Sequence, residues 1–600
     1  MYQSFDKTTS PDTAAPRLAA LRAEMAAQGL DGVLVPRADA HQGENVAPRD
    51  ERLAWLTGFT GSAGFAVALA EEAAIFVDGR YTLQVRAQTD TDAFAPQDWT
   101  GKEVGPWIAE RLSEGTIGFD PWLHTPREIA RLTKDLPKGV ELRPLDANPL
   151  DAAWSDQPAP PAAPLVIHPL DFAGEAHADK RARLAEDLRA KGAGAAVLSL
   201  PDSIAWLLNI RGADIARTPV ALLFAILHGD ATVDLFGAEG RTPDEVADHL
   251  GPDVRIHPAD ALLPALAALD GPVALHRASA PVALADALSH VELIDFEPVH
   301  RPKARKNDAE IAGSRAAHRR DGAAMAGFLH WLAEEGPTGR LTEIAIAKEL
   351  ESRRRTANEL RDISFETISG SGPNGAIVHY RVTEETDRTL TTGELMLVDS
   401  GGQYLDGTTD ITRTIAIAIG EVDPDAARAF TLVLKGMIAV SRLRFPPGLA
   451  GQHLDAVARV PLWEAGFDYA HGTGHGVGAY LGVHEGPQGL ARRYTEPFET
   501  GNILSNEPGY YREGAFGIRL ENLVVVEAPT VPEGGDLPMH GFETLTLAPI
   551  DRALILPHLL TRDEREWLDA YHARVLAEIG DLVPPATRDW LTAACAPLSA

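Results

Sequence analysis

The sequence has little cysteine and a deficit of basic residues, and both shortages narrow the classes of protein that it can encode. Its 600 residues include one cysteine, Cys595, so no disulfide can form within the chain, and we expect a reducing compartment. Basic residues number 55 against 86 acidic ones, which gives a formal charge of −31. This balance argues against a nucleic acid or an anionic membrane as partner.

Long apolar runs are also missing. Stretches such as VALLFAIL are far shorter than the roughly 18 residues that a membrane-spanning helix needs. The opening residues MYQSFDKTTSPD lack the basic and apolar regions of a secretory signal. The proportions of 45% hydrophobic and 24% charged residues are those of ordinary globular proteins. We therefore expect a cytoplasmic protein of several domains.

Two segments have the pattern of copies of one unit. RLAALRAEMAAQGLDGVLVPRAD, from Arg17, and RLAEDLRAKGAGAAVLSLPDS, from Arg183, each indicate an amphipathic helix, a glycine turn and an apolar strand. Each copy continues to a Trp-Leu pair, which begins at Trp55 in the first and at Trp206 in the second. The repeat is far longer than that of a solenoid, so it predicts duplicated α/β domains.

A proline-rich segment and a change in amino-acid composition mark the predicted domain boundaries. SDQPAPPAAP, residues 155–164, holds too much proline for a packed element and predicts an extended linker. It separates a first domain, 1–154, from a second, 165–302. A third domain, 303–540, is rich in glycine and in β-like runs, and a C-terminal extension covers 541–600.

Capping residues predict the N-termini of two helices. Asn307 offers a cap to a long helix with Glu310 in its first turn, and Thr561 with Glu564 forms a capping box before REWLDAYHARVLAEI.

The third domain places acids at the ends of strands. GELMLVDSGGQY predicts a strand that reaches Asp399 and then a tight turn with left-handed glycines, and ITRTIAIAI, after Asp410, predicts the next strand. If these strands are antiparallel neighbours, the two carboxylates lie side by side, and one stays protonated unless a cation lies between them. Taken alone, an aspartate in such a segment is more typical of an ordinary turn.

Histidines and glutamates follow in glycine-containing segments. His471, His475 and His484 lie in HGTGHGVGAYLGVHEGP, where the glycine density excludes a helix and thus a zinc-binding HExxH helix. Glu507 precedes a Pro-Gly pair, and Glu521 opens the run LVVVE. Singly, none of these residues would indicate a site.

As a set, five of these residues indicate a metal centre. Four carboxylates with one imidazole suit a pair of hard-to-borderline divalent cations, and four negative charges balance two such ions. The five residues are Asp399, Asp410, His475, Glu507 and Glu521.

A glycine motif elsewhere in the third domain has a different meaning. GSGPNG, residues 370–375, fits G-x-G-x-x-G, but the dinucleotide fingerprint requires a helix to open there. The proline and the following AIVHYRV predict a turn into a strand, so we reject nucleotide binding.

The order Asp, Asp, His, Glu, Glu, within VDSGGQY, TTDITRT, HGTGHGVG, NEPGYY and RLEN, resembles the pita-bread metallopeptidases, and among them the long, three-domain aminopeptidases P. TGFTGSAG, DGRYTLQ, KARKNDAEIAG and GFETLTLAPID extend the resemblance over nearly the whole chain. It implies two creatinase-like α/β domains, an α+β pita-bread catalytic domain and a C-terminal extension. The implied activity is hydrolysis of the N-terminal Xaa-Pro bond of peptides by a hydroxide held between two metal ions, usually Mn²⁺, with Co²⁺ or Zn²⁺ as alternatives.

The resemblance also implies a role for each metal-centre residue. Asp399 would chelate one ion, and Asp410 and Glu521 would bridge both. His475 and Glu507 would complete the other ion, and Glu507 would also act as general base.

Further residues match family positions around the substrate. His379, His471 and His484 would contact the substrate, with proton shuttling at His484. Arg519 would offset excess carboxylate charge, with a surface ion pair as the alternative, and Tyr511 would assist as a donor behind the ligands.

Arg80, in DGRY, matches a family signature and would act on the substrate or on a neighbouring subunit of a homodimer. Two other functions stay open at this point. A prolidase-type dipeptidase would use the same chemistry on Xaa-Pro dipeptides, and a binding module would have the fold without the activity.

Overall fold

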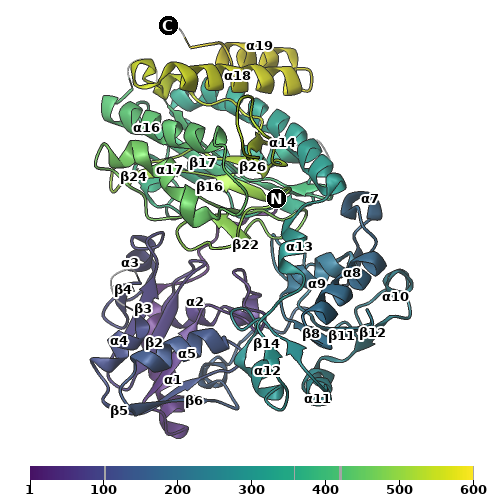
Figure 1. Ribbon diagram of the computed structural model, residues 1–600. Coiled ribbons are helices and arrows are strands. Elements are labelled where there is room, and N and C mark those ends of the chain that lie inside the picture. Colours follow the sequence, from purple (N-terminus) through teal and green to yellow (C-terminus); the bar gives the residue numbers. More distant parts are fainter. Residues whose placement is uncertain (100–102, 357–358, 418–421, 599–600) are drawn as a thin grey trace. The chain divides into compact units, whose positions relative to one another are not determined.

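The computed structural model divides the chain into two compact units, which we describe separately (Figure 1). The structure describes residues 1–99, 103–356, 359–417 and 422–598. One unit is Thr8–His300, and the other combines Met1–Lys7 with Arg301–Ala600. The first seven residues thus pack with the C-terminal unit, where Phe5 joins a buried cluster with Ile344 and Tyr380.

The N-terminal unit contains two six-stranded sheets with the same strand order and directions. The first has the order β4-β3-β2-β1-β5-β6 and the second β12-β11-β10-β8-β13-β14. In each, a central strand has an antiparallel neighbour on one side and a parallel neighbour on the other. The shared topology confirms the duplication predicted from the sequence.

The strands of the first sheet are β1 (Gly32–Pro36), β2 (Phe65–Leu69), β3 (Ala73–Val77), β4 (Ala95–Asp98), β5 (Glu114–Phe119) and β6 (Gly139–Pro144). Those of the second are β8 (Ala195–Leu198), β10 (Phe224–His228), β11 (Val233–Phe236), β12 (Val254–His257), β13 (Val273–Ala274) and β14 (Leu293–Ile294). A short pair, β7 (Val166–Ile167) with β9 (Ile210–Arg211), follows the proline-rich segment, and residues 158–165 form neither helix nor strand.

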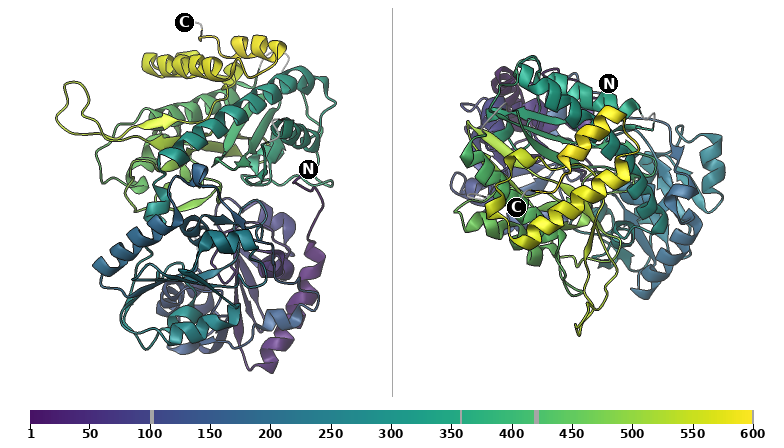
Figure 2. Two further views of the ribbon diagram at one scale, coloured as in Figure 1. Left: turned by 90° about the vertical axis from the view of Figure 1, so that its right-hand side faces the viewer. Right: turned by 90° about the horizontal axis from the view of Figure 1, so that it is seen from above.

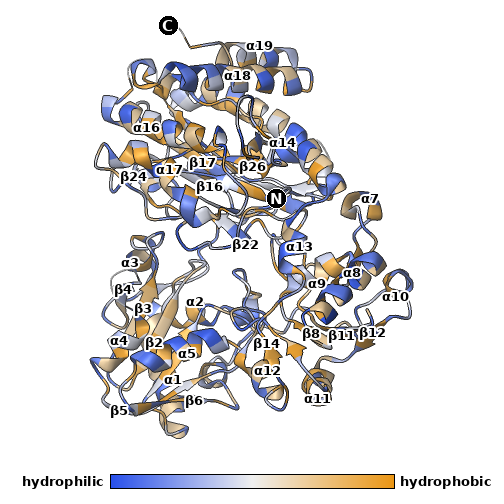
Figure 3. Ribbon diagram, in the orientation of Figure 1, coloured by the Kyte–Doolittle hydropathy of each residue, from blue (hydrophilic) through white to orange (hydrophobic). Residues whose placement is uncertain are grey.

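Apolar residues cover both faces of the first sheet. Val33 and Val35 of β1 belong to one buried cluster, and Leu34 between them belongs to another. Burial on both faces explains why β2 and β3 are continuous apolar runs rather than alternating ones, as their colouring in Figure 3 shows.

Helices flank the two sheets of this unit. They are α1 (Ala14–Ala27), α2 (Arg52–Thr57), α3 (Gln84–Gln88), α4 (Val104–Ala109), α5 (Pro126–Asp135), α6 (Pro149–Ala153), α7 (Leu170–Ala173), α8 (His177–Ala190), α9 (Pro201–Leu208), α10 (Asp244–Leu250), α11 (Leu262–Ala267) and α12 (Val282–Ala287). The helices predicted from Arg17 and Arg183 are α1 and α8, and both Trp-Leu pairs lie in the helix after the central strand, α2 and α9.

The C-terminal unit packs long helices around several small sheets (Figures 1 and 2). Its strands are β15 (Asp362–Ile363), β16 (Ile368–Ser371), β17 (Leu395–Ser400), β18 (Gly402–Tyr404), β19 (Gly407–Thr408), β20 (Ile411–Ala416), β21 (Gly474–Gly476), β22 (Glu485–Leu490), β23 (Ile503–Asn506), β24 (Gly509–Arg512), β25 (Phe516–Arg519), β26 (Asn522–Val526) and β27 (Phe542–Thr544). Two sheets carry the site described below, β16-β17-β20 and β22-β21-β23-β26-β27.

The helices of this part of the chain are α13 (His300–Ala304), α14 (Asp308–Glu335), α15 (Glu343–Thr356), α16 (Pro424–Ser441), α17 (Gly451–Trp463), α18 (Arg562–Ile579) and α19 (Pro585–Ala594). Both predicted caps are confirmed. Asn307 and Glu310 form a capping box at the start of α14, and Thr561 and Glu564 form one at the start of α18. Among the described residues, no helix has the length and the apolar character that crossing a bilayer requires.

The prediction of left-handed glycines after Asp399 is wrong. Neither Gly401 nor Gly402 has a positive φ, and Gly402 begins strand β18. Gly401 is needed for a different reason. A Cβ at this position would lie 2.0 Å from the carbonyl oxygen of Thr409 and 2.1 Å from the hydroxyl of Ser364. The close approach of backbone to backbone, and not the turn angle, requires glycine here.

The strand predicted over AIVHYRV is also absent. Residues 372–376 form a 3₁₀ helix, and the following residues form a turn. A buried carboxylate, that of Glu343, organises this segment because it accepts hydrogen bonds from Ser371, Asn374 and Tyr380. No α-helix opens after the glycines, which agrees with the rejection of nucleotide binding.

The glycine at 401 gives a test of this packing. We expect Gly401→Ala to lower the thermal unfolding midpoint of the C-terminal unit, because an added methyl group in a filled site costs about 1–3 kcal/mol. Gly327→Ala, in α14, is the matched control. Its Cβ would meet only the end of the Arg353 side chain, and alanine favours a helix by about 1 kcal/mol. Calorimetry in which both variants behave alike would contradict this account.

Candidate metal centre

Two antiparallel strands place the first two acids together. β17 and β20 pair with Asp399 opposite Thr412, and Asp410 directly precedes β20, two residues before Thr412. The prediction that these strands are antiparallel neighbours is confirmed. The intervening residues form the separate hairpin β18–β19, so the connection is longer than the tight turn expected.

The second sheet supplies the other three residues. His475 lies in β21, Glu507 directly follows β23 and Glu521 directly precedes β26. His475 Nε2 is 3.5 Å from Asp410 Oδ2 and 3.5 Å from Glu507 Oε1. One ligand atom each from Asp410, His475 and Glu521 lie within 4.8 Å of one another.

Local hydrogen bonds orient these side chains. His475 Nδ1 lies 2.9 Å from the carbonyl oxygen of Gly476. Since a carbonyl only accepts, Nδ1 carries the proton and the lone pair of Nε2 faces the acids. Ser505 links two neighbours, because its hydroxyl accepts from His475 N and donates to Glu507 Oε1 at 3.1 Å. Thr412 donates to Glu521 Oε2 at 2.8 Å.

The electrostatics of the cluster favour a cation. Burial, with repulsion from Asp399, raises the pKa of Asp410 well above its ordinary value. Burial, with repulsion from Asp410, does the same to the pKa of Glu521, and burial also raises the pKa of Glu507. Asp399 Oδ1 and Glu521 Oε1 are buried without a hydrogen-bond partner among the described residues. Buried carboxylate oxygens without hydrogen-bond partners fit the ligand set of divalent cations.

Arg519 is a buried member of the site and not a surface ion pair. It is 1% exposed, and its guanidinium bonds Asp399 Oδ2 at 2.6 Å and the Tyr511 hydroxyl at 2.6 Å. Burial alone lowers the pKa of Arg519, but Tyr511 and Asp399 together raise it well above its ordinary value. The Tyr511 hydroxyl also lies 2.9 Å from His471 Nε2, so a continuous chain joins Asp399 to His471.

An ion pair on α17 anchors the segment that carries His471, and sequence reasoning missed it. Arg459 donates to the carbonyl oxygens of His471 and Tyr469, each at 2.8 Å, and pairs with Asp455 at 2.8 Å. Asp455 also accepts from the Thr473 hydroxyl at 2.6 Å. The sequence signal was the i, i+4 acid–base pair on a helix just before the histidines.

His484 is exposed, and its ring centroid lies 4.2 Å from that of His475. The next residue, Glu485, is held by two buried lysines, Lys303 at 3.0 Å and Lys306 at a short distance. These lysines were also missed, because their pairing with Glu485 spans most of the domain.

The roles of two further predicted residues are not tested by the contacts described above. His379 is half-buried in the turn after residues 372–376. Arg80 belongs to the N-terminal unit, where Asp78 binds its guanidinium at 2.7 Å. The roles assigned to both stay predictions.

The sequence matches family models over almost its whole length. Residues 312–528 match metallopeptidase family M24, and 538–598 match the C-terminal region of that peptidase family. Residues 17–151 and 156–310 each match the creatinase/prolidase N-terminal domain. The chain belongs to metallopeptidase family M24, and the predicted fold class is confirmed.

Individual proteins within this family are similar to the chain over nearly its full length. A probable Xaa-Pro aminopeptidase P of Aspergillus niger is 40% identical over 97% of this chain and 98% of its own. One from Coccidioides posadasii is 38% identical over 98% and 94%. The crystal structure of X-prolyl aminopeptidase from Caenorhabditis elegans, described as a cytosolic enzyme with a di-nuclear active site, has a TM-score of 0.92 at 33% identity, and covers 98% of this chain and 100% of its own.

The raised pKa values give a pH prediction for the metal-free protein. When folded, Glu521 keeps a proton that the unfolded chain releases near its ordinary pKa of about 4.3. The folded state therefore binds more protons, and this group costs stability as pH rises towards its folded pKa. We expect Glu521→Gln to raise the unfolding midpoint of the metal-free protein, by more at about pH 8 than at about pH 5.

Added Mn²⁺ provides the counterpart measurement. It should raise the midpoint of the native protein more at the higher pH, because binding needs deprotonated ligands, and should raise that of Glu521→Gln much less. If the unfolding midpoints of the two metal-free proteins depend on pH in the same way, the Glu521 carboxyl group does not have a raised pKa in the folded protein.

Proposed function

We propose that this protein is an aminopeptidase that releases the N-terminal residue from peptides with proline in second position. The observation that carries the proposal is the convergence of four carboxylates and one imidazole in the C-terminal unit, with buried, unpartnered oxygens at Asp399 and Glu521. The names of its full-length relatives support the Xaa-Pro specificity.

We assign the five converging residues to two divalent cations, with Mn²⁺ as the proposed ion. Asp399 would chelate one ion, His475 and Glu507 the other, and Asp410 with Glu521 both. Bound there, two such cations lower the pKa of a water and polarise the scissile carbonyl group. The di-nuclear active site described for the Caenorhabditis elegans enzyme supports this assignment.

The protein's own residues would move the protons. The Ser505 hydroxyl fixes the orientation of Glu507 Oε1, and a carboxylate held within hydrogen-bond reach of a water can accept its proton. We assign general-base work to Glu507 on these grounds. His484, exposed beside His475, has access to both solvent and the site, which suits proton shuttling to the leaving group.

Arg519 would balance the acids without entering the reaction. Its fixed positive charge beside Asp399 offsets the charge of one of the four carboxylates. Through Tyr511 it also holds His471, which we place, with His379, in contact with the substrate. Arg80 is proposed to act on the substrate or on a neighbouring subunit.

The chemistry of the Xaa-Pro bond explains why such a site is needed. The bond is a tertiary amide without an N–H, so enzymes that bind their substrates as β-strands lose a hydrogen bond there. The free α-amino group of the first residue needs an anionic partner, and the carboxylates of this site can supply one. We also propose a cytoplasmic location and a homodimer.

Removing one bridging charge tests the mechanism. We expect Asp410→Asn to lower kcat by at least about 10³-fold, because electrostatic and nucleophile-generating contributions of this kind are worth several kcal/mol. Its unfolding midpoint should stay at or above that of the native metal-free protein. Retained turnover in a folded variant would remove Asp410 from the proposed role.

Substrate comparison tests the specificity. The Mn²⁺-loaded protein should release the first residue from an Xaa-Pro-Pro peptide, as measured by mass spectrometry, and leave an Xaa-Ala-Pro peptide intact. Cleavage of only an Xaa-Pro dipeptide would indicate a prolidase instead, and cleavage of none of the three would favour a binding role.

A further inference from the structure

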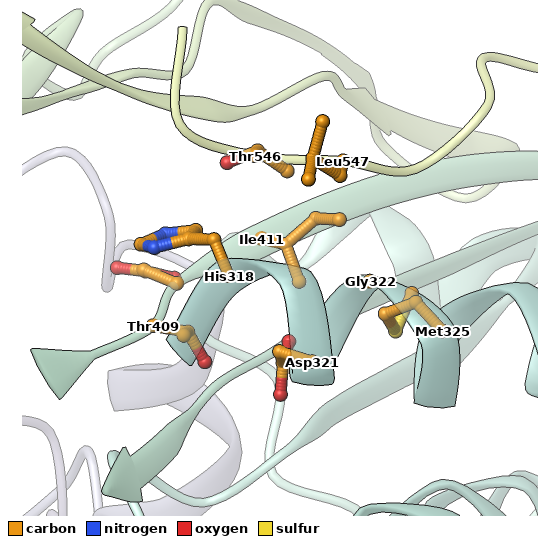
Figure 4. Close-up of a pocket in the computed structure, with 9 residues that line it drawn as sticks. His318, Asp321, Gly322, Met325, Thr409, Ile411, Thr546 and Leu547 are labelled. Atoms are coloured by element: carbon orange, nitrogen blue, oxygen red, sulfur yellow. The ribbon is translucent and has the colours of Figure 1, made fainter. Parts of the chain in front are cut away.

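A small cavity lies behind Asp410, on the side of helix α14. It measures about 10 Å³ and lies between α14, the start of β20 and the segment at Thr546 (Figure 4). The polar residues that line it are His318, Asp321, Thr409, Asp410 and Thr546. A cavity needs about 10–15 Å³ to hold one water molecule, together with two to four polar partners. Both conditions are met here.

His318 brings an unused acceptor to this cavity. The side chain is 3% exposed, and its Nδ1 lies 2.7 Å from the carbonyl oxygen of Ser314, one turn earlier on α14. Nδ1 must donate to that carbonyl, so Nε2 carries a lone pair. Nε2 is buried and has no partner among the described residues. Burial lowers the pKa of His318, which keeps the ring neutral and Nε2 an acceptor.

The next acid on α14 shows that the cavity is not simply a poorly packed region. Asp321 is fully satisfied, by Arg354 at 2.8 Å and by the Tyr404 hydroxyl at 2.7 Å. Figure 4 shows the Asp321 carboxyl group pointing away from the His318 ring. Within the described residues around this cavity, His318 Nε2 is therefore the polar atom that the protein leaves for something else to satisfy.

We propose that one ordered water occupies this cavity and donates one hydrogen to His318 Nε2 and the other to the Asp410 carboxylate, so that His318 is a positioning residue for Asp410. In so far as Asp410 is a metal ligand, the inference rests on the proposed function.

The hydrogen bonds of such a water balance. Both flanking hydroxyls already accept from the backbone, Thr409 Oγ1 from Gly402 N at 3.0 Å and Thr546 Oγ1 from Leu523 N at 2.8 Å. Each hydroxyl therefore keeps its own hydrogen to donate, and one of them can donate to the water oxygen. The water then donates twice and accepts once or twice, which is its ordinary valence.

The consequence for the site is a fixed carboxylate. A carboxylate that is oriented by a hydrogen bond from the water presents the same oxygens to a metal without reorganisation. Loss of such a hydrogen-bond partner of a metal ligand typically lowers metal affinity by about 10–100-fold. We expect His318→Phe, which fills the cavity and removes the acceptor, to weaken Mn²⁺ binding by about 10–100-fold. His318→Gln restores a side-chain acceptor and should recover part of the loss.

The experiment measures Mn²⁺ affinity of the full chain by competition with a chelator, together with the unfolding midpoint of each metal-free protein. Met325→Leu is the matched control. Met325 lines the apolar side of the same cavity, and this exchange keeps the volume and alters no hydrogen bond, so Mn²⁺ affinity should not change. A folded His318→Phe protein with native Mn²⁺ affinity would overturn the inference, as would equal losses in the phenylalanine and glutamine variants.

A high-resolution crystal structure of the native chain tests the water directly and covers the case in which His318→Phe does not fold. Density for a water between His318 Nε2 and Asp410 is expected, and a dry cavity would overturn the inference. Failure of the native chain to bind Mn²⁺ would count against the proposed function instead, while the water would still be seen or not seen.

Discussion

Mutual repulsion of acids in the core is the constraint on which the C-terminal unit depends. Asp399, Asp410 and Glu521 are each less than a tenth exposed, and burial with mutual repulsion raises the pKa of the latter two. A fold keeps such a cluster only if something offsets its cost, because isolated buried charges are strongly destabilising. One guanidinium, that of Arg519, is too little for four carboxylates. Two divalent cations would neutralise what remains and leave the site slightly positive, which suits attack on a carbonyl group.

The surrounding structure holds the acids apart from solvent and in place. Asp399 is positioned by Arg519 and Glu521 by Thr412, each a neighbour from a different strand, and Glu507 is positioned by Ser505, two residues earlier in the chain. The histidine side is fixed through the backbone, where Arg459 binds the carbonyl group of His471. Rigid strands with hydrogen-bonded side chains preorganise a site better than loops do.

The sequence allowed the acids to be predicted but not the network that supports them. Asp399 and Asp410 could be paired because strand period and chain proximity act over a few residues. The caps at Asn307 and Thr561 were local for the same reason. The local sequence predicts a turn glycine at Gly401, whereas the structure requires glycine there partly because Ser364, from a distant segment, packs against it. The pairing of Lys303 with Glu485 spans nearly two hundred residues. Contacts of this kind leave no periodic signal, so propensity and pattern cannot reveal them.

Placement of the site between two sheets gives the proposed cations a structural consequence. Asp399 and Asp410 belong to the β17–β20 pair, whereas His475, Glu507 and Glu521 belong to the sheet that contains β21, β23 and β26. Ions shared by the two groups would cross-link the sheets, and their binding free energy would add to the free energy of unfolding of this unit. Without ions, repulsion acts across the same boundary and favours opening there. Binding of the cations would therefore hold the two sheets together and balance the charge of the site at the same time.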